Sequence, residues 1–197
     1  MSNQLLSAPI VEPVTLADMK AYARISHAND DALLTDLISG AREWCEAFTG
    51  RAFITQTWRC TLSVFPKGRV LILPSGPLQS ITSVTFYNAS GEASSFDVSH
   101  LLLESGSVPS RAVLEDNAVW FPLQRAANGM VVDYVVGYGS SSADVPAPLR
   151  LAIKQLVLHW YENREAIARD ESITRVPMTV EALLKEYRVF KIGGSCV

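Results

Sequence analysis

Apolar residues recur at intervals of three and four along residues 146–166, the spacing that places them on one face of an α-helix. The stripe consists of Leu149, Ala152, Ile153, Leu156, Val157 and Trp160. Pro146 and Pro148 stand at its start, where proline is tolerated because first-turn N–H groups have no partner inside the helix. The pattern predicts a long core helix whose polar end, residues 161–165, is suited to an interaction.

Two further helices are predicted near the N-terminus. Thr15, followed three residues later by Asp18, resembles a capping box and would begin a short helix ending near Ile25. A longer helix is predicted for residues 31–49, and Gly50 stands where a left-handed residue often ends a helix. Its main apolar stripe is Leu34, Ile38, Ala41, Cys45 and Phe48, and the apolar residues beside the stripe are Leu33, Leu37 and Trp44.

After Gly50 the hydrophobic period changes from about 3.6 residues to two. Trp58, Cys60, Leu62 and Val64 alternate with polar residues, as in a half-buried antiparallel strand. Short strands are predicted at residues 69–73, 81–87, 96–98, 101–104, 111–114, 119–121 and 130–136. The fold class is therefore predicted as α+β, with an antiparallel β-domain inserted into a helical frame of two N-terminal helices, one long helix and one C-terminal helix.

Four regions follow from these patterns. Residues 1–14 are expected to form an extended arm, residues 15–50 and 140–168 a helical body, residues 51–139 the β insert, and residues 169–197 a linker, a helix and a tail. The final helix is predicted to begin with Thr179 as its cap. Because the linker before it is polar, we expect this segment to be held away from the body and to be dispensable for folding. The alternative is that it packs back onto its own body.

The composition is that of a globular protein: 197 residues, 48% hydrophobic and 19% charged. The net charge of −3 gives no general attraction for nucleic acid. Cys45, Cys60 and Cys196 show neither a disulfide pattern nor zinc-ligand spacing, so we expect a reducing environment and a buried, apolar role for the first two. The N-terminus lacks the features of a signal peptide, and no apolar run reaches the ~18 residues of a membrane span.

Residues able to carry catalysis do not gather in recognisable motifs. Gly137 and Gly139 follow a strand, but Ser142 replaces the third glycine of a dinucleotide loop and the neighbouring strands are predicted as antiparallel. The histidines (His27, His100 and His159) are far apart, Glu162 and Glu165 flank an arginine, and Ser140–Ser142 have no adjacent base. We therefore expect no enzyme activity, no cofactor and no metal site.

A series of short segments then indicates a family. In order they are LADMKAYARI (16–25), DDALLTDLI (30–38), AREWCE (41–46), TGR (49–51), TQTW (55–58), LILPSGP (71–77), GYG (137–139), WYENRE (160–165) and LLKEYRV (183–189). Together these segments resemble the head–tail connector (adaptor) proteins of tailed bacteriophages and gene transfer agents, in the longer branch with a β-rich insert. The likeness covers about residues 15–190 and is weakest over residues 94–128.

The resemblance implies a non-enzymatic virion protein, made in the host cytoplasm, that forms a ring below the portal, typically a dodecamer. Such a ring extends the DNA channel, and its partners are the portal protein, the stopper or head-closure protein and other copies of the same chain. DNA would pass through without sequence-specific binding, which suits a mildly acidic chain. No membrane is involved.

The resemblance and the apolar pattern together suggest two contact regions. The portal-binding candidates are Leu183, Leu184, Tyr187, Arg188, Val189 and Phe190. The ring-interface candidates are Leu33, Leu37, Trp44, Tyr161 and Arg164. A stopper or a tail-completion protein is the alternative function, although it leaves the helices unexplained, and a small Ser/His hydrolase is a second alternative. The ring number, the state of the free protein and a phage, prophage or gene transfer agent origin stay open.

Overall fold

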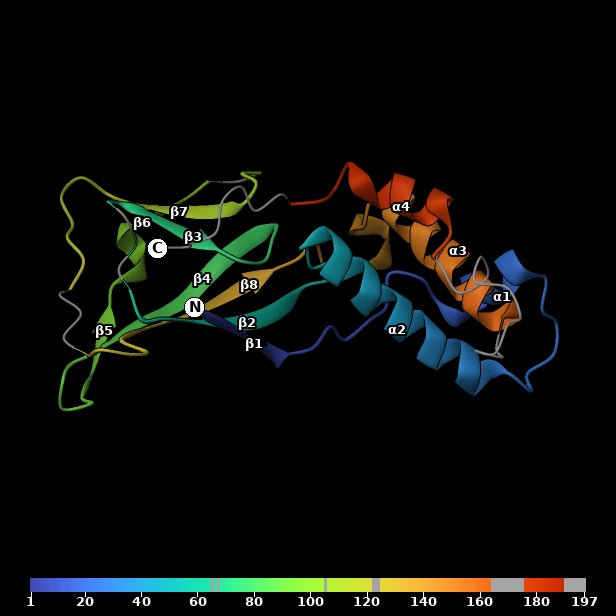
Figure 1. Cartoon of the computed structure of the whole chain (residues 1–197), viewed down its shortest axis with the longest axis horizontal. Helices are drawn as coiled ribbons and strands as arrows, with labels where there is room; N and C mark the ends of the chain where they lie inside the picture. Colours follow the sequence, from blue (N-terminus) through green and yellow to red (C-terminus); the bar gives the residue numbers. More distant parts are fainter. Residues whose placement is uncertain (65, 67, 105, 122–124, 164–175, 190–197) are drawn as a thin grey trace. The chain divides into compact units, whose positions relative to one another are not determined.

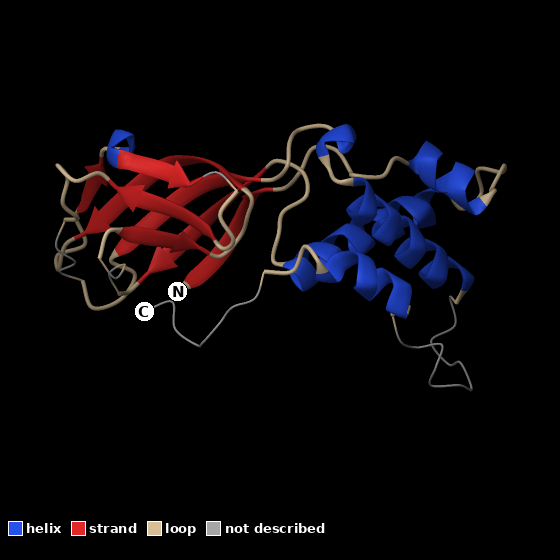
Figure 2. Cartoon of the chain, turned by 90° about the horizontal axis from the view of Figure 1, so that it is seen from above, coloured by secondary structure: helices blue, strands red, loops and turns tan. Residues whose placement is uncertain are grey.

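The computed structural model describes residues 1–64, 66, 68–104, 106–121, 125–163 and 176–189, and the chain divides into two compact units. One unit holds the strands and comprises Met1–Pro9, Thr55–Tyr138 and Val189. The other holds the helices and comprises Ile10–Ile54 and Gly139–Arg188 (Figures 1 and 2). The predicted α+β class is confirmed.

The helical unit is built from α1 (Leu16–Ala23), α2 (Asp31–Thr49), α3 (Ala147–Glu162) and α4 (Met178–Lys185), with a short 3-10 turn η2 (Ser142–Asp144) before α3. Helix α1 begins as predicted, because the Thr15 hydroxyl accepts a hydrogen bond from the Asp18 N–H at 3.1 Å. Helix α2 ends at Gly50, which is left-handed with φ of 71°. The core of the helical unit includes residues exposed by 2% or less on three helices: Met19, Leu34, Ile38, Cys45, Leu149, Ile153 and Leu156.

Helix α4 differs from the prediction in its start and in its packing. It begins at Met178, with Pro177 rather than Thr179 at the cap position. Val180 and Leu184 are completely buried, and the helix packs on α3 and α2 (Figure 1). The expectation that this segment is held away from the body is therefore wrong, because its apolar stripe is covered by its own unit. The linker from residue 164 to residue 175 lies outside the described residues.

The strand unit contains two antiparallel sheets. The five-stranded sheet has the order β1 (Ser2–Ser7), β2 (Gln56–Leu62), β8 (Met130–Val136), β4 (Leu78–Tyr87), β5 (Ala93–Phe96). The three-stranded sheet has the order β3 (Val70–Leu73), β7 (Ser110–Leu114), β6 (Leu101–Glu104), and a 3-10 turn η1 (Val98–His100) precedes β6. Alternate residues of both sheets form the core, as two-residue periodicity predicts, and the fully buried ones include Cys60, Leu71, Leu73, Val84, Ala112, Met130 and Val132.

Three local features of this unit differ from the sequence pattern. The strand predicted at residues 96–98 is wrong, because β5 ends at Phe96 and Val98 begins the 3-10 turn η1. Residues 119–121, predicted as a strand, have no strand partner among the residues that the structure describes. Instead the Trp120 ring lies 5.4 Å from the Phe96 ring, and the Phe121 ring lies 5.5 Å from the Phe86 ring. Aromatic packing rather than sheet hydrogen bonding therefore holds this segment. The N-terminal arm also supplies a strand, because β1 pairs with β2.

One ion pair on the outer face of the five-stranded sheet leads to a prediction about acid stability. Arg59 donates two hydrogen bonds of 2.7 Å to the carboxylate of Asp133, which also accepts one from Ser83. The Arg59 hydrogen bonds are the largest cause of a lowered pKa for Asp133. A carboxyl group whose pKa falls on folding stabilises the fold above its unfolded pKa, and this contribution is lost as the pH falls through the folded pKa.

We therefore expect Asp133→Asn to cost about 1 kcal/mol at neutral pH, because both groups are partly solvent-exposed. The difference between variant and wild type should shrink below about pH 4. Urea unfolding at pH 7 and at pH 3 measures this. Asp36→Asn, on the exposed side of α2, is the control and should keep the wild-type acid response. An equal deficit for Asp133→Asn at both pH values would contradict the assignment.

Candidate functional site

Aromatic rings and arginines gather where the end of α2 meets the segment after α4, within the helical unit. Trp44 and Phe48 are stacked with ring centroids 5.3 Å apart, and the Arg188 guanidinium lies 5.0 Å from the centre of the Phe48 ring. Arg51 Nε donates a 2.6 Å hydrogen bond to the backbone oxygen of Tyr187. We call Trp44, Phe48, Arg51, Tyr187 and Arg188 the aromatic–arginine cluster. It joins one ring-interface candidate to two portal-binding candidates.

Local sequence explains why these side chains meet. Trp44 and Phe48 are four residues apart on α2 and so lie on the same face of the helix. Gly50 then ends the helix in a left-handed conformation, after which Arg51 reaches the C-terminal segment. The two rings are half-buried, whereas Arg188 is exposed. An exposed arginine above an aromatic ring contributes only about 0.5–1 kcal/mol to stability through that contact.

Sequence reasoning did not identify Phe48 and Arg51 as site residues. Phe48 was assigned to the core stripe of α2, but the ring is only half-buried and supports Arg188. The spacing of four residues between Trp44 and Phe48 could have indicated that the two rings share one face of the helix. Arg51 gave no signal, because its partner is a backbone oxygen 136 positions along the chain.

The remaining ring-interface candidates lie elsewhere on the unit. Leu33 and Leu37 are half-buried on α2. A Cβ added at Gly40, on the same side of α2, would lie 3.8 Å from the Trp160 ring, so α3 covers part of this face. The Tyr161 hydroxyl donates a hydrogen bond to Asp30 at the start of α2, which gives it a role inside the unit. Arg164 lies outside the described residues.

The portal-binding candidates separate by exposure. Leu184 is completely buried and cannot touch a partner unless α4 unpacks. Leu183, Tyr187 and Val189 are half-buried, and Arg188 is exposed. Phe190 lies outside the described residues. The exposed part of the candidate set is therefore centred on Arg188.

A buried arginine on α2 joins three segments of the helical unit. Arg42, with a side chain 7% exposed, donates to Glu12 and to Glu46 at 2.8 Å each and to Glu43 at 3.3 Å. The second oxygen of Glu46 accepts the backbone N–H of Phe53 at 2.7 Å. One guanidinium therefore connects the segment before α1, helix α2 and the chain that leaves α2.

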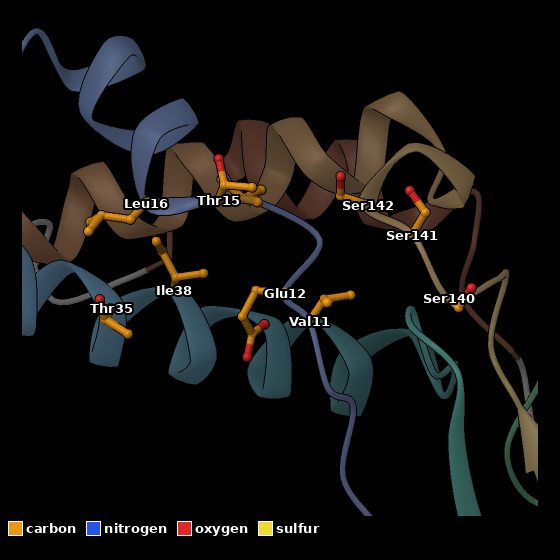
Figure 3. Close-up of a pocket in the computed structure, with 10 residues that line it drawn as sticks. Val11, Glu12, Thr15, Leu16, Thr35, Ile38, Ser140, Ser141 and Ser142 are labelled. Carbon is orange, nitrogen blue, oxygen red and sulfur yellow. The ribbon is translucent and has the colours of Figure 1, made fainter.

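A cavity of about 390 Å³ lies in the same unit (Figure 3). Its lining residues are Val11, Glu12, Val14, Thr15, Leu16, Thr35, Ile38, Ser140, Ser141 and Ser142. Its hydroxyl groups serve nearby backbone: Thr15 caps α1, Thr35 donates to the oxygen of Asp31, and Ser141 accepts from the N–H of Ala143. Its one carboxylate, Glu12, is bound by Arg42. Thr15, Thr35, Ser141 and Glu12 of the lining therefore have structural partners within the unit.

Other features that could carry chemistry have structural roles. Gly137 follows β8; its N–H donates to the oxygen of Pro77 and its oxygen accepts from the Gln79 side chain, so it is fixed to the sheet. Within the described residues, no three histidine, cysteine, aspartate or glutamate side chains are grouped as metal ligands would be. None of the helices described is both long enough and apolar enough to cross a membrane.

Comparison with known proteins gives one family and several structural matches. The model of a family described as head completion protein matches residues 12–190. A chain of the neck of an empty gene transfer agent particle, computed with C6 symmetry, is similar over 99% of both chains, with a TM-score of 0.83 and 21% identity. A chain of the native neck computed with C12 symmetry and one of the native virion cover the same shares at 21% identity, with TM-scores of 0.81 and 0.80. No curated protein matches the sequence.

Proposed function

The chain belongs to the head completion protein family, and we propose that it is a structural protein of the virion neck, where copies form a ring that joins the DNA-filled head to the tail. The family membership confirms the resemblance to head–tail connector proteins. The finer assignment, as an adaptor that binds the portal and extends the DNA channel, is part of the proposal.

One observation carries the proposal: a single chain of the gene transfer agent neck matches both units of this protein. The similarity to the neck chain covers 99% of each protein, so it includes the helices, both sheets and their order. The matched neck of the empty particle was computed with C6 symmetry and that of the native particle with C12 symmetry, and we infer a ring for this chain by analogy. A heterologous interface closes into such a ring when its rotation divides the circle.

An adaptor explains more of the chain than its alternatives. A stopper or tail-completion protein would use the sheets but leaves α2, α3 and the docked α4 without a purpose. The aromatic–arginine cluster also suits an adaptor, because an exposed arginine beside half-buried aromatic rings is a typical centre of a protein interface. We infer a non-enzymatic role from the family, whose described function is head completion.

Disrupting the gene in the producing strain tests the function. The expected product is DNA-filled heads without tails, and supplying the protein in trans should restore complete particles. Empty heads would point to a role in packaging. Normal tailed particles would contradict a neck function.

Arg188→Glu is expected to weaken binding to the purified portal ring at least about tenfold, the effect of losing an interface hot spot. The melting temperature should change little, because Arg188 is exposed. Cosedimentation or interferometry with immobilised portal measures the binding. Lys185→Glu makes the same charge change on the exposed side of α4 and should bind almost normally. Equal binding by both variants and the wild type would show that the aromatic–arginine cluster is not part of the portal interface.

A further inference from the structure

The two edge strands of the five-stranded sheet contain no charged residue, although Glu92 and Asp97 flank β5. All six residues of β1 (SNQLLS) are exposed, and three of the four residues of β5 (ASSF) are exposed. Neither strand contains a charged residue or a proline. The charged residues of this sheet's strands are Arg59 and Asp133, which pair with each other on the adjacent strands β2 and β8. The charges therefore lie inside the sheet and not at its edges.

Charged residues protect a sheet from unwanted strand pairing when they stand on its edge strands, and here they stand on inner strands. Edge strands expose unpaired N–H and C=O groups, and natural proteins usually guard them with charges, prolines, bulges or very short strands. Strand β5, with four residues, has only the last of these protections. Here the register shift between Leu5 and Ser7 disturbs only the end of β1. Among the residues that the structure describes, β1 pairs only with β2 and β5 only with β4. Within the described part of the chain, both edges are thus open to a further strand.

Strand β1 is nevertheless held firmly by its own sheet. The side-chain oxygen of Asn3 accepts a 2.9 Å hydrogen bond from the buried Tyr134 hydroxyl, and its amide donates to Ser75 at 3.1 Å. This anchoring fixes the position of the strand, so β1 presents an ordered edge and not a loose arm.

We propose that β5 of one copy pairs with β1 of the next copy, so that the sheet continues from subunit to subunit around the ring. This inference rests on the proposed ring. Four antiparallel steps separate the two strands, so β1 and β5 run in the same direction. A neighbour related by a modest rotation therefore presents its β1 parallel to β5, and the contact is heterologous as a closed ring requires.

A second copy of this chain pairs the backbone groups of both edge strands, which a different protein would not do. Each subunit offers one β1 edge and one β5 edge, so copies of the chain pair all of them in equal number around a closed ring. An extended segment from a different protein could cover one edge by strand addition, but it would leave the other open. Pairing of β1 with β1 would produce a two-fold dimer and would stop the ring from growing.

Cysteine cross-linking tests the contact. The strand register places Ser2 and Gln4 on the same outer side of the sheet as Arg59, and Ser95 on that side next to Thr85. Neighbouring strands bring facing Cα atoms to about 5 Å, within the range for a disulfide. The test variants are Gln4→Cys with Ser95→Cys and Ser2→Cys with Ser95→Cys, both carrying Cys196→Ser. Native Cys45 and Cys60 are buried, and burial raises the pKa of the Cys45 thiol to about 12.

The protein is assembled on purified portal rings, oxidised mildly and separated under denaturing, non-reducing conditions. A ladder of covalent multimers is expected from at least one pair. Thr57→Cys with Ser95→Cys is the matched control: Thr57 lies on the same outer side but on β2, one strand further in, and should give no ladder. Each single-cysteine variant should also give none.

A charge variant gives an independent readout. Gln4→Lys with Ser95→Lys puts like charges on both edges and should lower ring assembly at least tenfold without changing the melting temperature. Ser80→Lys with Thr82→Lys, exposed on β4 and outside the Val84–Tyr87 segment that pairs with β5, should assemble normally.

The possible failures are distinguishable. If the wild type forms no ring on the portal, both the edge contact and the proposed function are overturned. If rings form, no pair gives a ladder and the edge lysines assemble normally, the edge contact alone is wrong. If edge-lysine rings form but no longer bind another neck component, the edges receive that protein instead, which also overturns the contact.

Discussion

Replacing Arg42 by alanine is expected to lower the free energy of unfolding by about 3–5 kcal/mol, the usual cost of removing one partner of a buried ion cluster. The substitution would leave Glu12 and Glu46 without their cation in a largely buried setting. Burial by itself lowers the pKa of Arg42, and the two carboxylates more than offset this effect, so the charged form is favoured. Arg42 and the two carboxylates therefore stabilise the fold only when all three are present.

Urea unfolding followed by circular dichroism measures the effect. Glu43→Ala is the matched control, because the Glu43 side chain is 71% exposed and touches Arg42 only at 3.3 Å. Its expected cost is below about 0.5 kcal/mol. A loss of less than about 1 kcal/mol for Arg42→Ala would show that the three segments are held by other contacts.

The second large effect is expected at α4. Leu184→Ala should cost about 2–5 kcal/mol, because it removes a completely buried side chain and leaves a cavity. Ending the chain after Pro177 should cost more, since Val180 is lost as well. This reverses the expectation from the sequence, where the segment is dispensable for folding.

Thermal unfolding of Leu184→Ala, of the truncated chain and of Leu183→Ala separates the possibilities. Leu183 is the neighbouring leucine but only half-buried, so its replacement should cost about 1 kcal/mol. If the truncated chain melts at the wild-type temperature, α4 does not stabilise the body. In that case the C-terminal segment would be free to serve entirely as a binding element.

The sequence predicts the division into helical and β regions because the period of apolar residues changes at Gly50. It also predicts the stripe of α2, where Leu34 and Ile38 are buried as expected. The docking of α4 could not be predicted, since a helix of eight residues is marginal alone and its stability depends on a surface formed by distant residues. The polar linker before it carries no information about where that surface lies.

The candidate site was predictable only in part. Trp44 and Arg188 were each identified by type and position, but their convergence on Phe48 is a tertiary contact between segments about 140 residues apart. Strand β1 could not be predicted from the sequence pattern either. Its sequence SNQLLS lacks a regular two-residue alternation, and it is a strand because β2 and Asn3 hold it.

Cryo-electron microscopy of the purified protein mixed with portal rings from the same particle tests the central claim most directly. The account predicts one added ring of this chain on the portal, coaxial with the DNA channel, with the aromatic–arginine cluster at the portal contact. Portal rings that stay bare at high protein concentration, or that bind the chain only as scattered single copies, would contradict it.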